Sequence, residues 1–286
     1  SELDEGVVPV ITGFQGMNEL GDITTLGRGG SDTTGVALAV ALKADECQIY
    51  TDVDGVFTTD PRVCDKARLL KEVSFEEMLE LSSSGAKVLQ LRAVEYASKF
   101  NLPLRVLSSF QEGEGTLVQE EKNIMERPIV SGISSIDSEA KLTIRGVPDV
   151  PGVAAKILSP ISEAGIEVDV IVQNISADNN TDFTFTVDKS DAKKAEDILQ
   201  KTSQTLGGGS IEVDDEIAKI SIVGRGMRAH AGVASKMFQT LAKNEINISM
   251  ITTSEIKISV VIKKDEMTKA VKALHNAFDL DKELDT

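Results

Sequence analysis

The chain has 286 residues, and at about 100–200 residues per domain this length predicts two or three domains. Apolar residues make up 41% and charged residues 27%, as in ordinary globular proteins. The 46 acidic residues outnumber the 30 basic ones, and the net charge of −16 argues against nonspecific binding to nucleic acid or anionic membrane. With only two cysteines, Cys47 and Cys64, a disulfide scaffold and a cysteine zinc site are excluded, and a reducing cytoplasm is expected. No apolar run approaches the roughly 20 residues of a transmembrane helix, and the first residues lack the pattern of a signal peptide.

Strand and helix patterns alternate in the first part of the chain. Apolar, β-branched runs predict buried strands, and Ser74 with Glu77 has the spacing of a capping box that opens a helix. This alternation predicts a mostly parallel α/β sheet. The predicted strands are 7–14, 46–53 and 102–109, and the other predicted helices are about 32–43 and 86–100.

The second part is an internal repeat. Residues 141–146 (KLTIRG) match 219–224 (KISIVG), and residues 151–171 match 231–251. Each copy reads strand, helix, strand, strand, helix, which predicts two ferredoxin-like βαββαβ units. SIEV (210–213) is a candidate fourth strand of the first unit. The charged C-terminus is a poor candidate for the same strand of the second, so strands exchanged between the copies are an open alternative.

A glycine-rich loop precedes the first predicted helix. Gly27, Gly29 and Gly30 surround Arg28 in TLGRGGSD, where backbone amides at a helix N-terminus can bind an anion. The spacing is that of neither a P-loop nor a GxGxxG fingerprint. The alternative is an ordinary turn in which Ser31 or Asp32 caps the helix.

Two further segments are candidates for the same site. YTDVDGVFTTDPR (50–62) follows a strand at the sheet edge where open α/β folds bind ligands, although Asp-Gly and Asp-Pro are also common turn formers. Lys87 falls in the first turn of a predicted helix, where a cation is disfavoured unless it faces an anionic ligand or solvent. The histidines, His230 and His275, are too far apart in sequence to suggest a site.

These motifs resemble the C-terminal half of the aspartokinase catalytic domain, which has the amino-acid-kinase fold. The resemblance rests on TTLGRGGSDTTGVAL, YTDVDGVFTTDPR and GAKVLQLRAVEYA, and the paired repeats resemble the two ACT domains of lysine- or threonine-regulated aspartokinases. The family's glycine-rich KFGGTS-type segment, whose lysine contacts ATP phosphates, does not occur in this sequence. We therefore expect a partial amino-acid-kinase αβα sandwich followed by two ACT domains, and negligible activity from this chain alone.

The resemblance implies a role for each matching residue. Arg28, Ser31 and Asp32 would form the reaction centre, with Asp32 as the catalytic aspartate. ATP, with Mg²⁺ as the expected bridging ion, would be held by Gly29, Gly30, Thr51, Asp52, Phe57, Thr58, Thr59, Asp60, Pro61, Arg62, Lys87 and Val88. The implied reaction phosphorylates L-aspartate to 4-phospho-L-aspartate, the first step of lysine, threonine and methionine biosynthesis.

The loop GVPDVPG (146–152) is the candidate effector site of the first repeat. Asp149 can pair with the ammonium of an amino acid, while amides near Gly152 take its carboxylate. The resemblance implies that lysine or threonine binds at Asp149, Gly152, Ala154, Gln173, Asn174, Thr181 and Asp182. The second copy has GMRAHAG (226–232) instead, so the two pockets are expected to be unequal.

The expected boundaries are a kinase segment at 1–118, a linker at 119–138, and ACT domains at 139–215 and 216–286. The expected assembly is a homodimer or higher oligomer that pairs through its ACT domains. Two other functions stay open: a noncatalytic amino-acid-sensing subunit, and another amino-acid kinase such as a glutamate kinase, which the tandem repeat disfavours.

Overall fold

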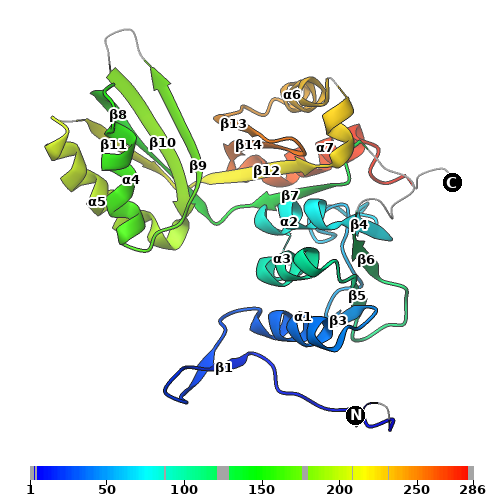
Figure 1. The fold of residues 1–286 in the computed structure, drawn as a ribbon. Helices are drawn as coiled ribbons and strands as arrows, with labels where there is room; N and C mark the ends of the chain where they lie inside the picture. The colour runs from blue at the N-terminus through cyan, green and yellow to red at the C-terminus, as the bar shows by residue number, and fades with distance from the viewer. Residues whose placement is uncertain are drawn as a thin grey trace.

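The structure is a computed structural model that describes residues 3, 5–86, 88–120, 129–175, 180–207, 209–230 and 232–282. It contains three four-stranded sheets and a short hairpin, and Figure 1 shows the sheet of β12–β14 above that of β3–β6, with the sheet of β8–β11 to one side. Within these ranges, no helix combines the length and the apolar character needed to cross a bilayer. Both cysteines are free and buried.

The kinase segment is built on a mixed sheet in the order β3-β5-β6-β4. β3 pairs parallel with β5, β5 antiparallel with β6, and β4 parallel with β6, so the predicted sheet is only partly parallel. One apolar core joins this sheet to three helices. The elements are β3 (Cys47–Thr51), β4 (Glu72–Ser74), β5 (Leu104–Ser108), β6 (Thr116–Gln119), α1 (Gly30–Leu42), α2 (Phe75–Ser83) and α3 (Leu91–Phe100).

The predicted buried strand at residues 7–14 is wrong. These residues form no strand, and Val8 and Val10 are 84% and 97% exposed. The nearby hairpin pairs β1 (Gln15–Met17) with β2 (Ile23–Thr25). An apolar run is buried as a strand only where neighbouring strands or helices cover it, and the described residues provide no such cover here.

The first repeat folds as predicted. Its antiparallel sheet has the order β11-β8-β10-β9, and SIEV lies in β11, which pairs with β8 as the fourth strand. Phe183 and Phe185 alternate with polar residues along β10 and are at most 1% exposed in the core. The elements are β8 (Glu139–Pro148), α4 (Val153–Glu163), β9 (Val168–Ile175), β10 (Asn180–Asp188), α5 (Ala192–Thr205) and β11 (Ser210–Asp214).

The fourth strand of the second repeat comes from the part of the chain that precedes the first repeat. Its sheet has the order β13-β14-β12-β7, and β7 (Gly132–Ile136) pairs antiparallel with β12. The first repeat is therefore inserted between two strands of the second, and residues 132–136 belong to a sheet rather than to the predicted linker. The other elements are β12 (Ile217–Val223), α6 (Val233–Lys243), β13 (Met250–Thr253), β14 (Lys257–Lys263) and α7 (Met267–Ala277).

Candidate active site and effector site

The glycine-rich loop ends at the N-terminus of α1. Gly29 is the N-cap residue with φ 73°, in the left-handed region that glycine adopts without strain. No side chain in the described ranges caps this helix, so the alternative in which Ser31 or Asp32 caps it is wrong. An uncapped first turn behind a glycine loop presents N–H groups to an anion.

Asp32 lies half-buried in the first turn of α1. Its Oδ2 accepts a hydrogen bond from the backbone N–H of Gln90 at 3.4 Å. Burial raises the pKa of this carboxyl above its usual value, and the Gln90 bond opposes that rise. Burial raises the pKa of the Cys47 thiol, and the negative charge of Asp32 raises it further. The carboxylate therefore lies in a partly dry position between α1, α3 and β3.

Gln90 is a residue of this site that the sequence did not reveal. Its Oε1 accepts from the N–H of Ala93, which makes it the N-cap of α3, whereas the predicted helix began at 86 and hid the cap. A Cβ atom on Gly29 would lie 2.3 Å from Cγ of Gln90. Gly29 is thus required both by its φ and by the packing of the loop on Gln90.

A second group of predicted residues gathers beyond the end of β3. Thr51 donates to Asp52 through their side chains at 3.1 Å. The guanidinium of Arg62 donates to both carboxylate oxygens of Asp60, with Nε to Oδ1 at 3.0 Å and Nη2 to Oδ2 at 2.8 Å, and this pairing lowers the pKa of Asp60. Arg62 is exposed, with its side chain 89% accessible, so it is available to a charged ligand. Within the described part of the chain, no hydrogen bond or ion pair joins this group to the glycine loop.

The predicted nucleotide residues differ in accessibility. Phe57 is half-buried and Pro61 exposed, whereas Thr58 and Thr59 are 0% and 4% exposed, which directs the two threonines inward. Val88 packs partly buried against the kinase core, and Lys87 lies outside the described residues.

The predicted effector residues fall into two cavities. Asp149, Gly152, Ala154 and Gln173 line a cavity of about 420 Å³ at the start of α4. Gln173 Nε2 lies 3.5 Å from Asp149 Oδ1, and Gly152 is the N-cap at φ 92° with no side-chain cap in the described residues. A carboxylate, an amide and free helix N–H groups therefore converge there, a set of groups that suits a small zwitterion.

Asn174 and Asp182 line a different cavity of about 460 Å³, between the first repeat and residues 248–251, which lead into β13. Asp182 is paired with Arg145 at 3.2 Å and accepts from the N–H of Gly146 at 2.9 Å. Thr181 is fully buried, and its hydroxyl donates to the backbone carbonyl of Asn174. This side chain therefore stabilises the sheet and does not line either cavity. The seven predicted effector residues thus do not form one pocket.

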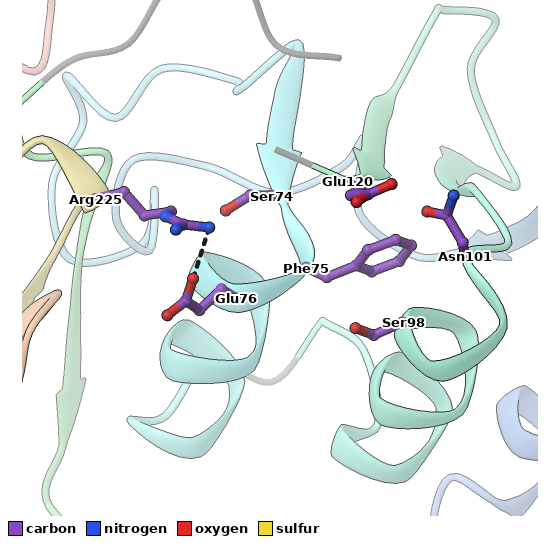
Figure 2. A pocket seen from close by; sticks show the side chains of 7 residues that line it. All are labelled: Ser74, Phe75, Glu76, Ser98, Asn101, Glu120 and Arg225. Carbon is purple, nitrogen blue, oxygen red and sulfur yellow. Dashed lines mark ion pairs between the residues drawn. The ribbon is translucent and has the colours of Figure 1, made fainter. Parts of the chain in front are cut away.

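A third cavity, of about 620 Å³, contains none of the predicted residues. It lies between the first turn of α2 and the end of α3, and Figure 2 shows Glu76 paired with Arg225 from the second repeat on one side. Glu76 Oε2 and Arg225 Nη1 are 2.6 Å apart. This ion pair fastens the kinase segment to the second repeat.

The comparisons with known proteins cover the same parts of the chain. Residues 1–108 match the amino acid kinase family, and residues 142–202 and 220–278 match the ACT domain. An aspartate kinase of Pseudomonas putida is 64% identical over 98% of this chain, which spans 69% of that protein.

Solved structures agree. E. coli aspartokinase III in complex with aspartate and ADP (R-state) superposes with a TM-score of 0.79 at 29% identity, over 93% of this chain and 59% of that one. The same enzyme in complex with lysine and aspartate (T-state) gives 0.75. The regulatory subunit of aspartate kinase from Thermus thermophilus gives 0.50 at 38% identity and covers 52% of this chain, which spans 99% of that subunit. The chain belongs to the aspartate kinase family.

Proposed function

We propose that this chain carries the nucleotide-binding part of an aspartate kinase, which transfers the γ-phosphoryl group of ATP to L-aspartate to give ADP and 4-phospho-L-aspartate, the first step of lysine, threonine and methionine biosynthesis. The observation that carries this proposal is the GRGGSD loop, which ends at an uncapped helix N-terminus beside the half-buried Asp32. The relative from E. coli, solved with aspartate and ADP, supports the choice of substrates.

In the proposed reaction the carboxylate of the substrate is the nucleophile, so no side chain needs to form a covalent intermediate. Phosphoryl transfer depends mainly on positioning and on stabilising the charge of the transferred group. The amides of the first turn of α1 and the guanidinium of Arg28 would stabilise the negative charge of the transferred group, and Asp32 would orient the reacting groups. The nucleotide would contact Thr51, Asp52 and the exposed Arg62. The buried Thr58 and Thr59 would hold the segment that carries Arg62 in place.

Mg²⁺ is part of the proposal as a companion of ATP. In the described ranges no group of three His, Cys, Asp or Glu side chains is placed to hold a metal ion. Mg²⁺ needs no such group, because one or two carboxylates together with substrate phosphates usually hold it. Asp32 and Asp52 are the carboxylates of the two site groups that are available for that purpose.

We propose further that lysine or threonine binds at the first ACT repeat and inhibits the enzyme. The cavity at Asp149 and Gly152 carries this part of the proposal, because it pairs a carboxylate with helix N–H groups. The lysine-bound relative from E. coli supports the choice of effector. Pairing of two copies through the edges of the ACT sheets completes the proposed assembly.

Replacing Asp32 in a longer form of the enzyme, one that includes the family's lysine-glycine-glycine segment, tests the proposed catalytic role. Asp32→Ala should abolish turnover in an assay coupled to ADP release, with unchanged circular dichroism. Asp45→Ala, which removes an exposed carboxylate, is the matched control and should leave turnover intact. Wild-type turnover in Asp32→Ala would contradict the role of Asp32. We expect the 286-residue chain alone to have negligible turnover.

A noncatalytic amino-acid-sensing subunit is the second candidate function. The match to the Thermus thermophilus regulatory subunit, nearly all of which this chain spans, favours it. The GRGGSD loop and Arg62 would then have no ligand. Calorimetry on the 286-residue chain would support this alternative if lysine or threonine binds and ADP does not.

A further inference from the structure

The segment between β3 and β4 packs into the second ACT repeat. Cys64 is 3% exposed and lies in the apolar core of that repeat with Leu274 and Leu280, and Val63 packs against the same core. Val56 and Leu70, at the two ends of the segment, lie in the core of the kinase segment. The motif TTDPR is therefore carried on a segment shared by two cores.

Thr58 is the residue of this motif that the second repeat holds most directly. It is fully buried, and its backbone carbonyl accepts from the N–H of Ile133 in β7 at 2.7 Å. Its own N–H donates to the carbonyl of Arg68 at 2.8 Å, which closes the segment into a loop. The backbone at Thr58 is thus fixed by the second ACT sheet on one side and by its own loop on the other.

The hydroxyl of Thr58 makes a third contact, with a histidine of α7. Its Oγ1 accepts from the N–H of Arg68 at 2.9 Å and lies 2.9 Å from Nε2 of His275. Oγ1 keeps its own proton and one further lone pair, so the pair forms a hydrogen bond in either neutral tautomer of the ring: Thr58 donates to a bare Nε2, or Nε2–H donates to Thr58. Nδ1 is buried and has no hydrogen-bond partner among the described residues, which leaves the Thr58 bond as the polar contact that orients the ring.

The ring of His275 is uncharged near neutral pH. The residue is 1% exposed, and burial lowers the pKa of its imidazole. Arg68 and Lys66, from the loop, lower that pKa further, whereas Asp281, which follows α7, raises it. A neutral ring makes the Thr58 bond without placing a charge in this buried position.

We propose that His275 is a positioning residue for nucleotide binding: from the second ACT repeat, it holds Thr58 and through it keeps residues 57–62 in the conformation that contacts ATP. This inference rests on the proposed nucleotide-binding function. It makes α7 a direct route between the second ACT repeat and the nucleotide segment, with no need for the first repeat. A shift of α7 would move the loop that carries Thr58, because helix and loop share an apolar core and a buried hydrogen bond.

Two measurements on the 286-residue chain test the proposal. The first is the affinity for ADP by calorimetry, in wild type, Thr58→Val and Thr58→Ser. Loss of the buried hydroxyl in Thr58→Val should weaken ADP binding by about tenfold, the equivalent of one buried hydrogen bond. Thr58→Ser keeps the hydroxyl and should bind within about twofold of wild type, a rescue that a purely packing role for the threonine methyl would not give.

The second measurement is nitrogen NMR of the histidine rings, which are assignable because the chain has only two. We expect the ring of His275 to be neutral, and we expect ADP to shift the His275 signals. His230, which is exposed and bonded to the carbonyl of Gly226, is the internal control and should not respond to ADP. This measurement stands on wild type alone, so it holds even if Thr58→Val fails to fold.

The outcomes separate the inference from the function beneath it. If wild type binds no ADP, the proposed nucleotide function fails and the inference fails with it. If wild type binds ADP but Thr58→Val binds equally well, or His275 does not respond, only the inference is overturned.

Discussion

At the scale of single residues, buried polar side chains join the kinase segment to the second repeat. Glu77 is 8% exposed, and its Oε1 accepts from the hydroxyl of Ser131 at 2.6 Å and from the N–H of Arg225 at 3.1 Å. Its other oxygen accepts from the hydroxyl and the N–H of Ser74. A buried carboxylate with four donors is satisfied only in this arrangement, so Glu77 specifies how α2 sits on the second repeat.

The depressed pKa of His275 makes stability depend on pH. An unfolded histidine protonates below a pH of about 6.5, whereas the folded ring resists protonation. The unfolded state therefore binds more protons in the window just below pH 6.5, and the folded state loses stability as pH falls from there to the lower folded pKa. Urea unfolding at pH 7.5 and at pH 5.5 should show a larger drop for wild type than for His275→Gln. Equal drops would mean that His275 titrates normally.

At the scale of elements, the sequence predicted what depends on local chemistry. The Ser74–Glu77 capping box is present at the start of α2, and the first helix of each repeat, α4 or α6, has a glycine N-cap, Gly152 or Gly232. The sequence failed where burial depends on distant partners. Residues 7–14 look like a core strand but have no cover among the described residues. β7 falls in the predicted linker because its partner strand, β12, lies far along the chain.

The candidate site shows the same limit. The glycine loop and Asp149 were predicted because their chemistry is local, and each lies at a helix N-terminus. Gln90 contacts Asp32 across a sequence separation of 58 positions, and Thr58 contacts His275 across one of 217 positions. No local sequence pattern encodes contacts between residues so far apart.

The loop before α4 gives a prediction at this scale. Asp149 is half-exposed beside Gln173, so its contribution to an ammonium ligand is smaller than that of a fully buried pair. Asp149→Ala should still weaken binding of lysine or threonine, whichever binds, by at least about tenfold. Glu167→Ala removes an exposed carboxylate outside the cavity and is the control. Calorimetry decides, and a larger loss in Asp182→Ala than in Asp149→Ala would place the effector in the second cavity instead.

At the scale of the whole molecule, a buried cation joins the two repeats. Lys219 in β12 is 4% exposed, and its Nζ contacts Glu139 of β8 at 2.6 Å and the carboxylate of Asp169 in β9. Burial raises the pKa of Glu139, and Lys219 opposes that rise. Lys219→Met should lower the free energy of unfolding by about 3–5 kcal/mol, because it leaves a buried carboxylate unpaired. Adding Glu139→Gln should restore much of the loss in urea unfolding, and a single variant within about 1 kcal/mol of wild type would contradict this account.

Two copies of the chain are expected to associate through the edges of their ACT sheets. β9 and β13 are edge strands of the two ACT sheets, and Ile171 and Ile251 on them are 49% and 46% exposed. Unpaired strand edges with apolar side chains favour pairing with another chain, and a closed two-fold pair buries both. Sedimentation at tens of micromolar should therefore show a species of about twice the 30.7 kDa chain mass. Ile171→Lys places a charge on one edge and should shift the protein towards monomer, while Leu42→Lys, on an exposed site of α1, should not. Sedimentation as a monomer throughout that range would show that these edges stay unpaired in solution.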